Sequence, residues 1–279
     1  MKETLSEFRK SKEFLVCVDS DGCAMDTMNI KHEKCFAPEA IKEWGLQDIE
    51  TEFKKNWNRI NLYSKTRGIN RFKGLVKTFE SLSTNNVNVP DFSSILEWTE
   101  TSPELSNPAL EKVISKTKDK QLIKALSWSK AVNKAISELP EDDKPFVSVR
   151  EGLEAISAVA DVVIVSSANA SALKSEWTRH ELSKYVQVML GQEAGSKAYC
   201  IGVLKENSYL NHKVLMVGDA PGDLEAAKKN DVLYYPILVG KEDFSWERLA
   251  SEALQKFLNG TYMGEYQKKL IDEFNNNLK

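Results

Sequence analysis

Two short acidic motifs carry the residues of this chain that are best suited to chemistry. The first is Asp19-Ser20-Asp21-Gly22, and the second is Gly218-Asp219-Ala220-Pro221-Gly222-Asp223. Each follows directly on a short run of apolar, largely β-branched residues, which is typical of a strand buried on both faces of a parallel sheet. Ligands of open parallel sheets bind beyond the carboxyl ends of the strands, so we expect the four aspartates to converge there.

A metal ion is the simplest partner for converging carboxylates. Asp19, Asp21, Asp219 and Asp223 would repel one another unless a cation lay among them, and Mg²⁺ prefers hard oxygen ligands of this kind. Each motif also has a simpler interpretation. The first could be a surface turn or a calcium loop, although the calcium-loop pattern with its terminal Glu is missing. The second could be an ordinary aspartate cap where a strand leads into a helix.

Asp19 and Asp21 are suited to two different roles in acid–base chemistry. They flank a single residue at the end of the first apolar run, and side chains alternate along an extended chain, so both can point the same way. Two carboxylates so close do not ionise alike, because one stays charged while the pKa of the other rises. The pair can therefore supply a nucleophile and a proton donor, and Gly22 allows a sharp turn after them.

Hydroxyl groups and a lysine complete the set of candidates. Ser166 and Ser167 end an apolar run and precede an expected helix, so a hydroxyl and backbone N–H groups could face an anion at that helix N-terminus. Lys197 begins another expected helix, where a cation opposes the helix dipole. A phosphate or Asp223 would compensate for this, whereas a solvated lysine needs no partner. Lys213, just before the third apolar run, is the alternative to Lys197.

The composition favours a soluble protein that binds neither nucleic acid nor membrane. Of the 279 residues, 42% are hydrophobic and 28% are charged, and the formal net charge is −3. This balance gives no electrostatic basis for a nucleic-acid or membrane partner, and no apolar stretch approaches the roughly 20 residues that span a bilayer. The charged N-terminus lacks an apolar signal region, so we expect a cytoplasmic protein. Its oligomeric state, monomer or homodimer, is left open. The four cysteines show no CxxC or zinc-like spacing.

The chain is expected to fold as an α/β protein with an inserted all-helical domain. Residues 28–147 show helical periodicity interrupted by turns and prolines, with no further strand-like run. From residue 148 onward, short apolar strands alternate with helices, which favours βαβ units and a parallel sheet with helices on both faces. We therefore predict a Rossmann-like core of residues 1–27 and 148–279 and a helical domain of residues 28–147.

Together these motifs resemble those of the haloacid dehalogenase-like (HAD) hydrolase superfamily. The four motifs of that family match, in order, Asp19-Ser20-Asp21-Gly22, Ser166, Lys197 and the acidic motif that ends at Asp223. The first and fourth are specific, whereas the second and third gain meaning from their context. The insertion after the first motif resembles the family's helical type 1 cap, in an unusually long form.

The resemblance implies a role for each matching residue. Asp19 would be the nucleophile that forms an aspartyl-phosphate, and Asp21 would protonate the leaving group and then activate water. Asp19, the backbone carbonyl of Asp21, and Asp219 would hold Mg²⁺, with Asp223 as a further ligand or directly behind the ligands. The residues that would bind the phosphoryl group are Ser166, Lys197 and, as the alternative to Ser166, Ser167.

Asp21 points to one reaction within the family. Members that cleave carbon–halogen or carbon–phosphorus bonds lack an acid at this position, so the resemblance favours hydrolysis of a phosphoric monoester. We expect a Mg²⁺-dependent phosphatase of a small phosphorylated metabolite. The alternatives are a phosphomutase, which would share every candidate residue, and a non-catalytic phosphoacceptor or binding module such as a receiver domain. Receiver domains are much shorter and lack a large insertion.

Substrate selection is expected to come from the cap. Residues 59–73 mix basic and aromatic side chains, which could grip an anionic or ring-bearing leaving group. The alternative is a solvated turn between two helices. The candidate specificity residues are Arg59, Tyr63, Arg67 and Arg71.

Overall fold

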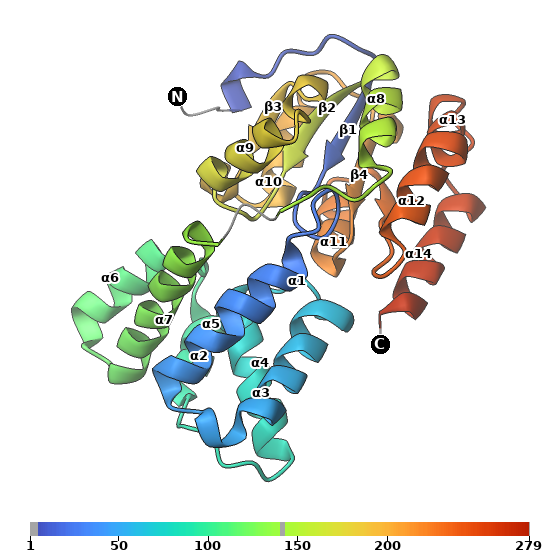
Figure 1. The fold of residues 1–279 in the computed structure, drawn as a ribbon. Helices are drawn as coiled ribbons and strands as arrows, with labels where there is room; N and C mark the ends of the chain where they lie inside the picture. The colour runs from blue at the N-terminus through green and yellow to red at the C-terminus, as the bar shows by residue number, and fades with distance from the viewer. Residues whose placement is uncertain (1–4, 140–142, 279) are drawn as a thin grey trace. The chain divides into compact units, whose positions relative to one another are not determined.

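The computed structural model describes residues 5–139 and 143–278 and divides into two compact units. The α/β unit comprises Met1–Thr27 and Asp142–Lys279, and the helical unit comprises Met28–Glu141 (Figure 1). The sequence analysis placed the second boundary later, after residue 147. The difference arises because Asp26 N donates to Lys144 O at 2.8 Å and Phe146 N donates to Ala24 O at 3.1 Å, which ties this segment to the α/β unit.

A five-stranded parallel sheet forms the centre of the α/β unit, in the order β3-β2-β1-β4-β5. This confirms the predicted Rossmann-like α/β class. The strands are β1 (Phe14–Val18), β2 (Ala160–Val165), β3 (Val188–Leu190), β4 (Val214–Gly218) and β5 (Leu233–Pro236).

The strand order reverses between β1 and β4, and this switch point positions the site. Val18 pairs with Val217 of β4 on one side and with Ile164 of β2 on the other. Asp19 N donates to Val217 O at 3.0 Å, which continues the pairing by one residue. Asp19, Ser166 and Asp219 therefore leave adjacent strands at the same carboxyl edge, where open α/β sheets bind ligands.

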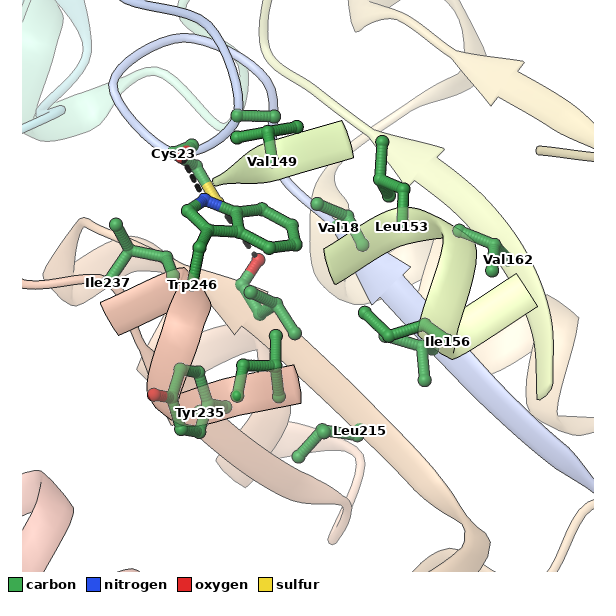
Figure 2. Packing of buried hydrophobic residues seen from close by; sticks show 14 of the residues in the cluster. Val18, Cys23, Val149, Leu153, Ile156, Val162, Leu215, Tyr235, Ile237 and Trp246 are labelled. Atoms are coloured by element: carbon green, nitrogen blue, oxygen red, sulfur yellow. Dashed lines mark hydrogen bonds between the residues drawn. The ribbon is translucent and has the colours of Figure 1, made fainter. Parts of the chain in front are cut away.

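Alternation of side chains along the strands produces an apolar core on each face of the sheet. Val16 and Val18 face one cluster, and Leu15 and Cys17 face the other. Residues of α8 (Val149–Val159), α9 (Ala170–Arg179), α12 (Glu242–Arg248) and α13 (Leu254–Leu258) contribute to the first cluster, part of which is drawn in Figure 2. Residues of α10 (Lys197–Lys205), α11 (Pro221–Lys229) and the end of α14 (Glu265–Asn277) contribute to the second.

The helical unit has its own core, rich in aromatic residues. Trp57 and Trp128 are fully buried there, and Phe72 packs edge-on against Trp128 with ring centroids 6.0 Å apart. Its helices are α1 (Met28–Lys31), α2 (Ala37–Trp44), α3 (Glu50–Asn58), α4 (Arg71–Thr84), α5 (Ser93–Thr101), α6 (Asn107–Thr117) and α7 (Lys120–Ser137), with π-helical turns at His32–Phe36 and Arg59–Tyr63.

None of the helices in the described part of the chain is both long enough and apolar enough to cross a membrane.

Candidate active site

Three buried aspartates meet at the carboxyl edge of the sheet. Asp19 follows β1, Asp219 follows β4, and Asp223 lies in the first turn of α11. One ligand oxygen from each lies within 4.8 Å of the others, and the three residues are at most 6% exposed. The convergence that the sequence analysis expected is therefore present for these three carboxylates.

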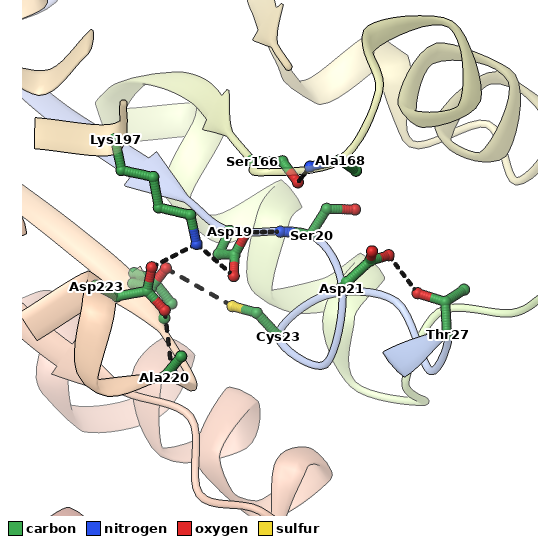
Figure 3. A network of polar contacts seen from close by, with 12 residues as sticks. Asp19, Ser20, Asp21, Cys23, Thr27, Ser166, Ala168, Lys197, Ala220 and Asp223 are labelled. Carbon is green, nitrogen blue, oxygen red and sulfur yellow. Dashed lines mark hydrogen bonds and ion pairs between the residues drawn. The ribbon is translucent and has the colours of Figure 1, made fainter. Parts of the chain in front are cut away.

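Lys197 bridges two of the aspartates from the N-terminus of α10. Its Nζ lies 2.7 Å from Asp19 Oδ2 and 2.5 Å from Asp223 Oδ1, as Figure 3 shows. Burial alone would lower the pKa of Lys197, but the attraction of Asp19 and Asp223 raises it above the ordinary lysine value. Lys197 therefore stays charged, and its position at the start of a helix, unfavourable by itself, is compensated by two carboxylates.

The environment of Asp19 disfavours its charge when no further cation is present. Burial raises the pKa of Asp19 well above its usual value, and the charges of Asp223 and Asp219 raise it further, while Lys197 lowers it. The Asp19 side chain is nevertheless oriented, since its Oδ1 accepts the N–H of Ser20 at 2.8 Å.

Asp223 is held rigidly from both ends of its carboxylate. Oδ1 pairs with Lys197, and Oδ2 accepts the N–H of Ala220 at 3.0 Å. Gly218 makes room for it, because a Cβ at that position would lie 2.4 Å from both Cγ and Oδ2 of Asp223. The glycine at the end of β4 is thus a steric requirement for this carboxylate.

Asp21 is set apart from the three-carboxylate cluster. It is partly exposed, and its Oδ1 accepts the hydroxyl of Thr27 at 2.5 Å (Figure 3). Its carboxylate is therefore in a different environment from that of Asp19, which is what separate nucleophile and proton-transfer roles require. Thr27, for which the sequence indicated no role at Asp21, orients this side chain.

Ser166 follows β2 directly and begins a loop that is held by its own hydrogen bonds. Ser166 is buried and its Oγ accepts the N–H of Ala168 at 3.1 Å, whereas Ser167 is exposed. The expected anion site at the N-terminus of α9 is partly occupied by the protein itself. Glu193 accepts the N–H of Ala170 at 3.0 Å, and Asn169 caps the following N–H groups.

The alternative lysine, Lys213, lies at the opposite end of β4. It forms an ion pair with Glu13 and lies over the Phe14 ring, 5.5 Å from the centroid. Because Lys213 precedes a strand and Lys197 follows one, only Lys197 is at the edge that holds the aspartates.

The four candidate specificity residues have different surroundings in the helical unit. Arg59 is exposed and donates to Ser81 Oγ at 3.0 Å, and Tyr63 is 40% exposed. Arg67 is buried and donates to Leu62 O at 2.6 Å. Arg71 forms hydrogen bonds with neutral groups, which are described below with the proposed function.

The donor set fits a divalent cation with oxygen ligands. Three carboxylates and one ammonium group leave a net charge of about −2 in a buried cluster, which a single Mg²⁺ would neutralise. The raised pKa of Asp19 indicates the same deficit of positive charge. Asp19, Asp219 and Asp223 are the side chains that could hold the ion.

The fold and the acidic edge of the sheet define an α/β enzyme with a buried oxygen-ligand site. A family model described as haloacid dehalogenase-like hydrolase matches residues 69–235, more than half of the chain. The chain belongs to this hydrolase family, which confirms the resemblance found in the sequence and the prediction of a hydrolase. The matched range contains Ser166, Lys197 and the second acidic motif.

Several solved structures are similar to this chain at low identity. A haloacid dehalogenase-like family hydrolase from Streptococcus pneumoniae is 15% identical, with 84% of this chain and 90% of that chain covered and a TM-score of 0.45. A predicted phosphatase from Clostridium acetobutylicum is 13% identical, with 94% and 100% covered and a TM-score of 0.46. A predicted phosphoglycolate phosphatase from Haemophilus somnus is 13% identical, with 81% and 86% covered and a TM-score of 0.48. No curated protein sequence matches significantly. These likenesses identify no substrate.

Proposed function

We propose that this protein is a Mg²⁺-dependent phosphatase that hydrolyses a small phosphorylated metabolite through an aspartyl-phosphate on Asp19. The observation that carries the proposal is the buried cluster in which Lys197 bridges Asp19 and Asp223 beside Asp219. Family membership supports the same class of reaction.

Asp19 is the proposed nucleophile. One of its carboxylate oxygens attacks phosphorus, the bond from phosphorus to the ester oxygen breaks, and the phosphoryl group is transferred to Asp19. The bond from Asp19 Oδ1 to Ser20 N keeps the carboxylate in one orientation. Mg²⁺ held by Asp19, Asp219 and Asp223 would supply positive charge that keeps Asp19 ionised and neutralises the phosphoryl oxygens.

Asp21 is the proposed acid and base. Its proton passes to the leaving oxygen as the ester bond breaks, and its carboxylate then takes a proton from water, which attacks phosphorus and releases phosphate and free Asp19. The hydrogen bond from Thr27 orients the Asp21 carboxylate for this proton transfer. Ser166 and Lys197 would bind the oxygens of the transferring group.

Arg71 is the residue of the helical unit that we propose to recognise an anionic part of the substrate. Its Nη1 lies 2.7 Å from Asn133 Oδ1 and 3.1 Å from Ser129 Oγ, and the guanidinium lies over the Phe36 ring, 5.0 Å from the centroid. Burial lowers the pKa of Arg71 to about 10, and no carboxylate of the described residues pairs with it. A partly buried cation with neutral partners is suited to bind a carboxylate or a second phosphate.

Phosphate release from a panel of phosphorylated sugars, nucleotides and small acids tests the proposal. Activity should require Mg²⁺, disappear with chelator and be lost in Asp19→Asn. Asp21→Asn should lower kcat about 10²–10⁴-fold, and less for an aryl phosphate, because a phenolate leaves without a proton. Arg71→Met should raise KM for substrates with a second anionic group more than for simple alkyl phosphates.

Two results would contradict this function. Folded protein that binds Mg²⁺ but releases no phosphate from any substrate would rule out a general phosphatase. Strong activation by a bisphosphorylated sugar, with isomerisation and little phosphate release, would instead support the phosphomutase alternative.

A further inference from the structure

Two tryptophans hold the turn that carries Asp19 and Asp21. Trp177 Nε1 donates to Ser20 Oγ at 2.9 Å, and Trp246 Nε1 donates to Cys23 O at 2.8 Å. Both indoles are fully buried. They come from α9 and α12, so two separate helices form hydrogen bonds with the same turn.

Ser20 is the centre of this turn. Its carbonyl accepts the N–H groups of Cys23, Ala24 and Met25 at 3.2, 2.9 and 2.8 Å, and its own N–H donates to the carboxylate of Asp19. The Ser20 side chain lies between those of the two aspartates in sequence and is directed to Trp177. A hydrogen bond to Ser20 Oγ therefore restrains the peptide groups on both sides of it, and with them the two carboxylates.

The Trp177 bond also connects two parts of the proposed catalytic machinery. Trp177 lies in α9, the helix that directly follows the Ser166 loop. The N-terminal end of α9 is fastened by Glu193, which accepts the N–H of Ala170. The nucleophile turn and the phosphate-binding loop are thus linked through one helix and one buried hydrogen bond.

Packing within the first apolar cluster sets the orientation of the Trp246 indole. It packs against α8 at Gly152, where a Cβ would lie only 2.5 Å from Trp246 Cε3. Val149 of α8 lies beside the ring in Figure 2, which also shows the bond to Cys23 O. The absence of a side chain at Gly152 is what allows the indole N–H to reach the turn.

We infer that Trp177 and Trp246 are positioning residues for Asp19 and Asp21. This inference rests on the proposed function. Neither indole touches a reacting atom. Their contribution is to keep the nucleophile and the acid in fixed places relative to the bound phosphoryl group, where a misplacement of about 1 Å can cost about 10²-fold in rate.

Variants that remove the indole N–H and keep an aromatic ring test this inference in the full-length protein. Trp177→Phe and Trp246→Phe should each lower kcat roughly tenfold or more with KM changed less than about twofold, because orientation is lost and binding is not. Ser20→Ala should reproduce Trp177→Phe, and the double variant should be no worse than either single variant, since both remove one interaction.

Tyr262→Phe is the matched control in the same unit. The buried Tyr262 hydroxyl donates to Tyr234 O at 2.8 Å, and among the described residues none of its contacts involves the catalytic turn. Its loss should lower the unfolding temperature as Trp177→Phe does and leave kcat unchanged. If Trp177→Phe and Trp246→Phe behave like Tyr262→Phe, the inference is wrong and the indoles serve stability alone.

Amide hydrogen exchange provides a readout that needs no substrate. The N–H groups of Cys23, Ala24 and Met25 should lose protection in Trp177→Phe and Trp246→Phe, and keep it in Tyr262→Phe. Unchanged protection in the tryptophan variants would overturn the inference even if kcat fell. The two proposals can also fail separately. If the tryptophan variants lose protection but the wild type hydrolyses no phosphomonoester, the proposed function is wrong and the restraint on the turn still holds.

Discussion

Lys197 is the residue on which the balance of charge in the site depends. Its ammonium group touches Asp19 and Asp223 at 2.7 and 2.5 Å, yet burial still raises the pKa of Asp19. One buried cation is therefore insufficient for three carboxylates, and a divalent ion completes the neutralisation.

Gly218 offers a test of the ligand cluster that leaves every carboxylate in place. In Gly218→Ala the new Cβ would come within 2.4 Å of the Asp223 carboxylate, which is buried and bound at both ends and has to be displaced. We expect the Mg²⁺ concentration for half-maximal activity to rise about tenfold or more, equivalent to about 1.4 kcal/mol of lost binding. Mg²⁺ titrations of activity and of heat of binding measure this.

Gly222→Ala is the control for this variant, from the same acidic motif. A Cβ at Gly222 meets no heavy atom within 4 Å, and the residue lies in the first turn of α11, where alanine is a better helix former. Its Mg²⁺ requirement should stay within about twofold of wild type. Equal behaviour of the two variants would show that Asp223 takes no part in binding the ion.

The sequence could predict the site residues that directly follow a strand, because the topology of a parallel sheet determines where the strand ends meet. Asp19, Ser166 and Asp219 each end a recognisable apolar run, and a parallel sheet brings such ends to one edge. Lys197 was preferred over Lys213, and the structure places Lys197 beside Asp19 and Asp223. Trp177 and Trp246 were missed because a buried tryptophan has the same sequence pattern whether or not its N–H binds a functional turn.

The segment before β1 is fastened to the start of β2 by one buried carboxylate. Asp161 accepts the N–H groups of Ser11 and Lys12 at 2.9 and 2.8 Å and the hydroxyl of Tyr209 at 2.5 Å. Gln187 also donates to it. The sequence analysis did not identify this contact, because Asp161 stands at the beginning of a strand and belongs to no motif.

This contact predicts a defined pH dependence of stability. Burial alone would raise the pKa of Asp161, but the hydrogen bonds from Ser11, Tyr209 and Lys12 outweigh it and hold the pKa below the usual aspartate value. A folded-state pKa that is depressed stabilises the protein above the unfolded-state pKa, near 4, and this stabilisation is lost as the pH falls through the folded-state pKa.

Asp161→Asn should therefore lower the free energy of unfolding by about 2 kcal/mol at pH 7, the scale of a hydrogen bond to a charged group. The difference from wild type should begin to shrink below about pH 4, where the carboxyl of the unfolded wild type takes up a proton, and should be lost as the pH falls through the lower folded-state pKa. Urea unfolding at several pH values measures it, with Asp272→Asn, an exposed aspartate of α14, as the control. A difference that is independent of pH would attribute the loss to packing instead.

The proposed ion site lies in the α/β unit, whereas helices α1 to α7 belong to the helical unit. The sequence located the helical insertion because its apolar periodicity differs from that of the strands, but it could not locate the return to the α/β unit. That return depends on backbone bonds of Lys144 and Phe146, which follow no side-chain pattern. Asp19, Asp219 and Asp223 all belong to the α/β unit.

Mg²⁺ should consequently stabilise the two units unequally. Bound at about 100 times its Kd, it would add about 2.7 kcal/mol to the α/β unit, and amide exchange in β1, β4 and α11 should slow accordingly. Exchange in residues 28–139 should change little, because none of the three carboxylates lies there. In Asp219→Asn, Mg²⁺ should protect neither unit. Equal slowing of both units in the wild type would instead mean that the two units open as one cooperative body, or that residues of the helical unit contribute to the ion site.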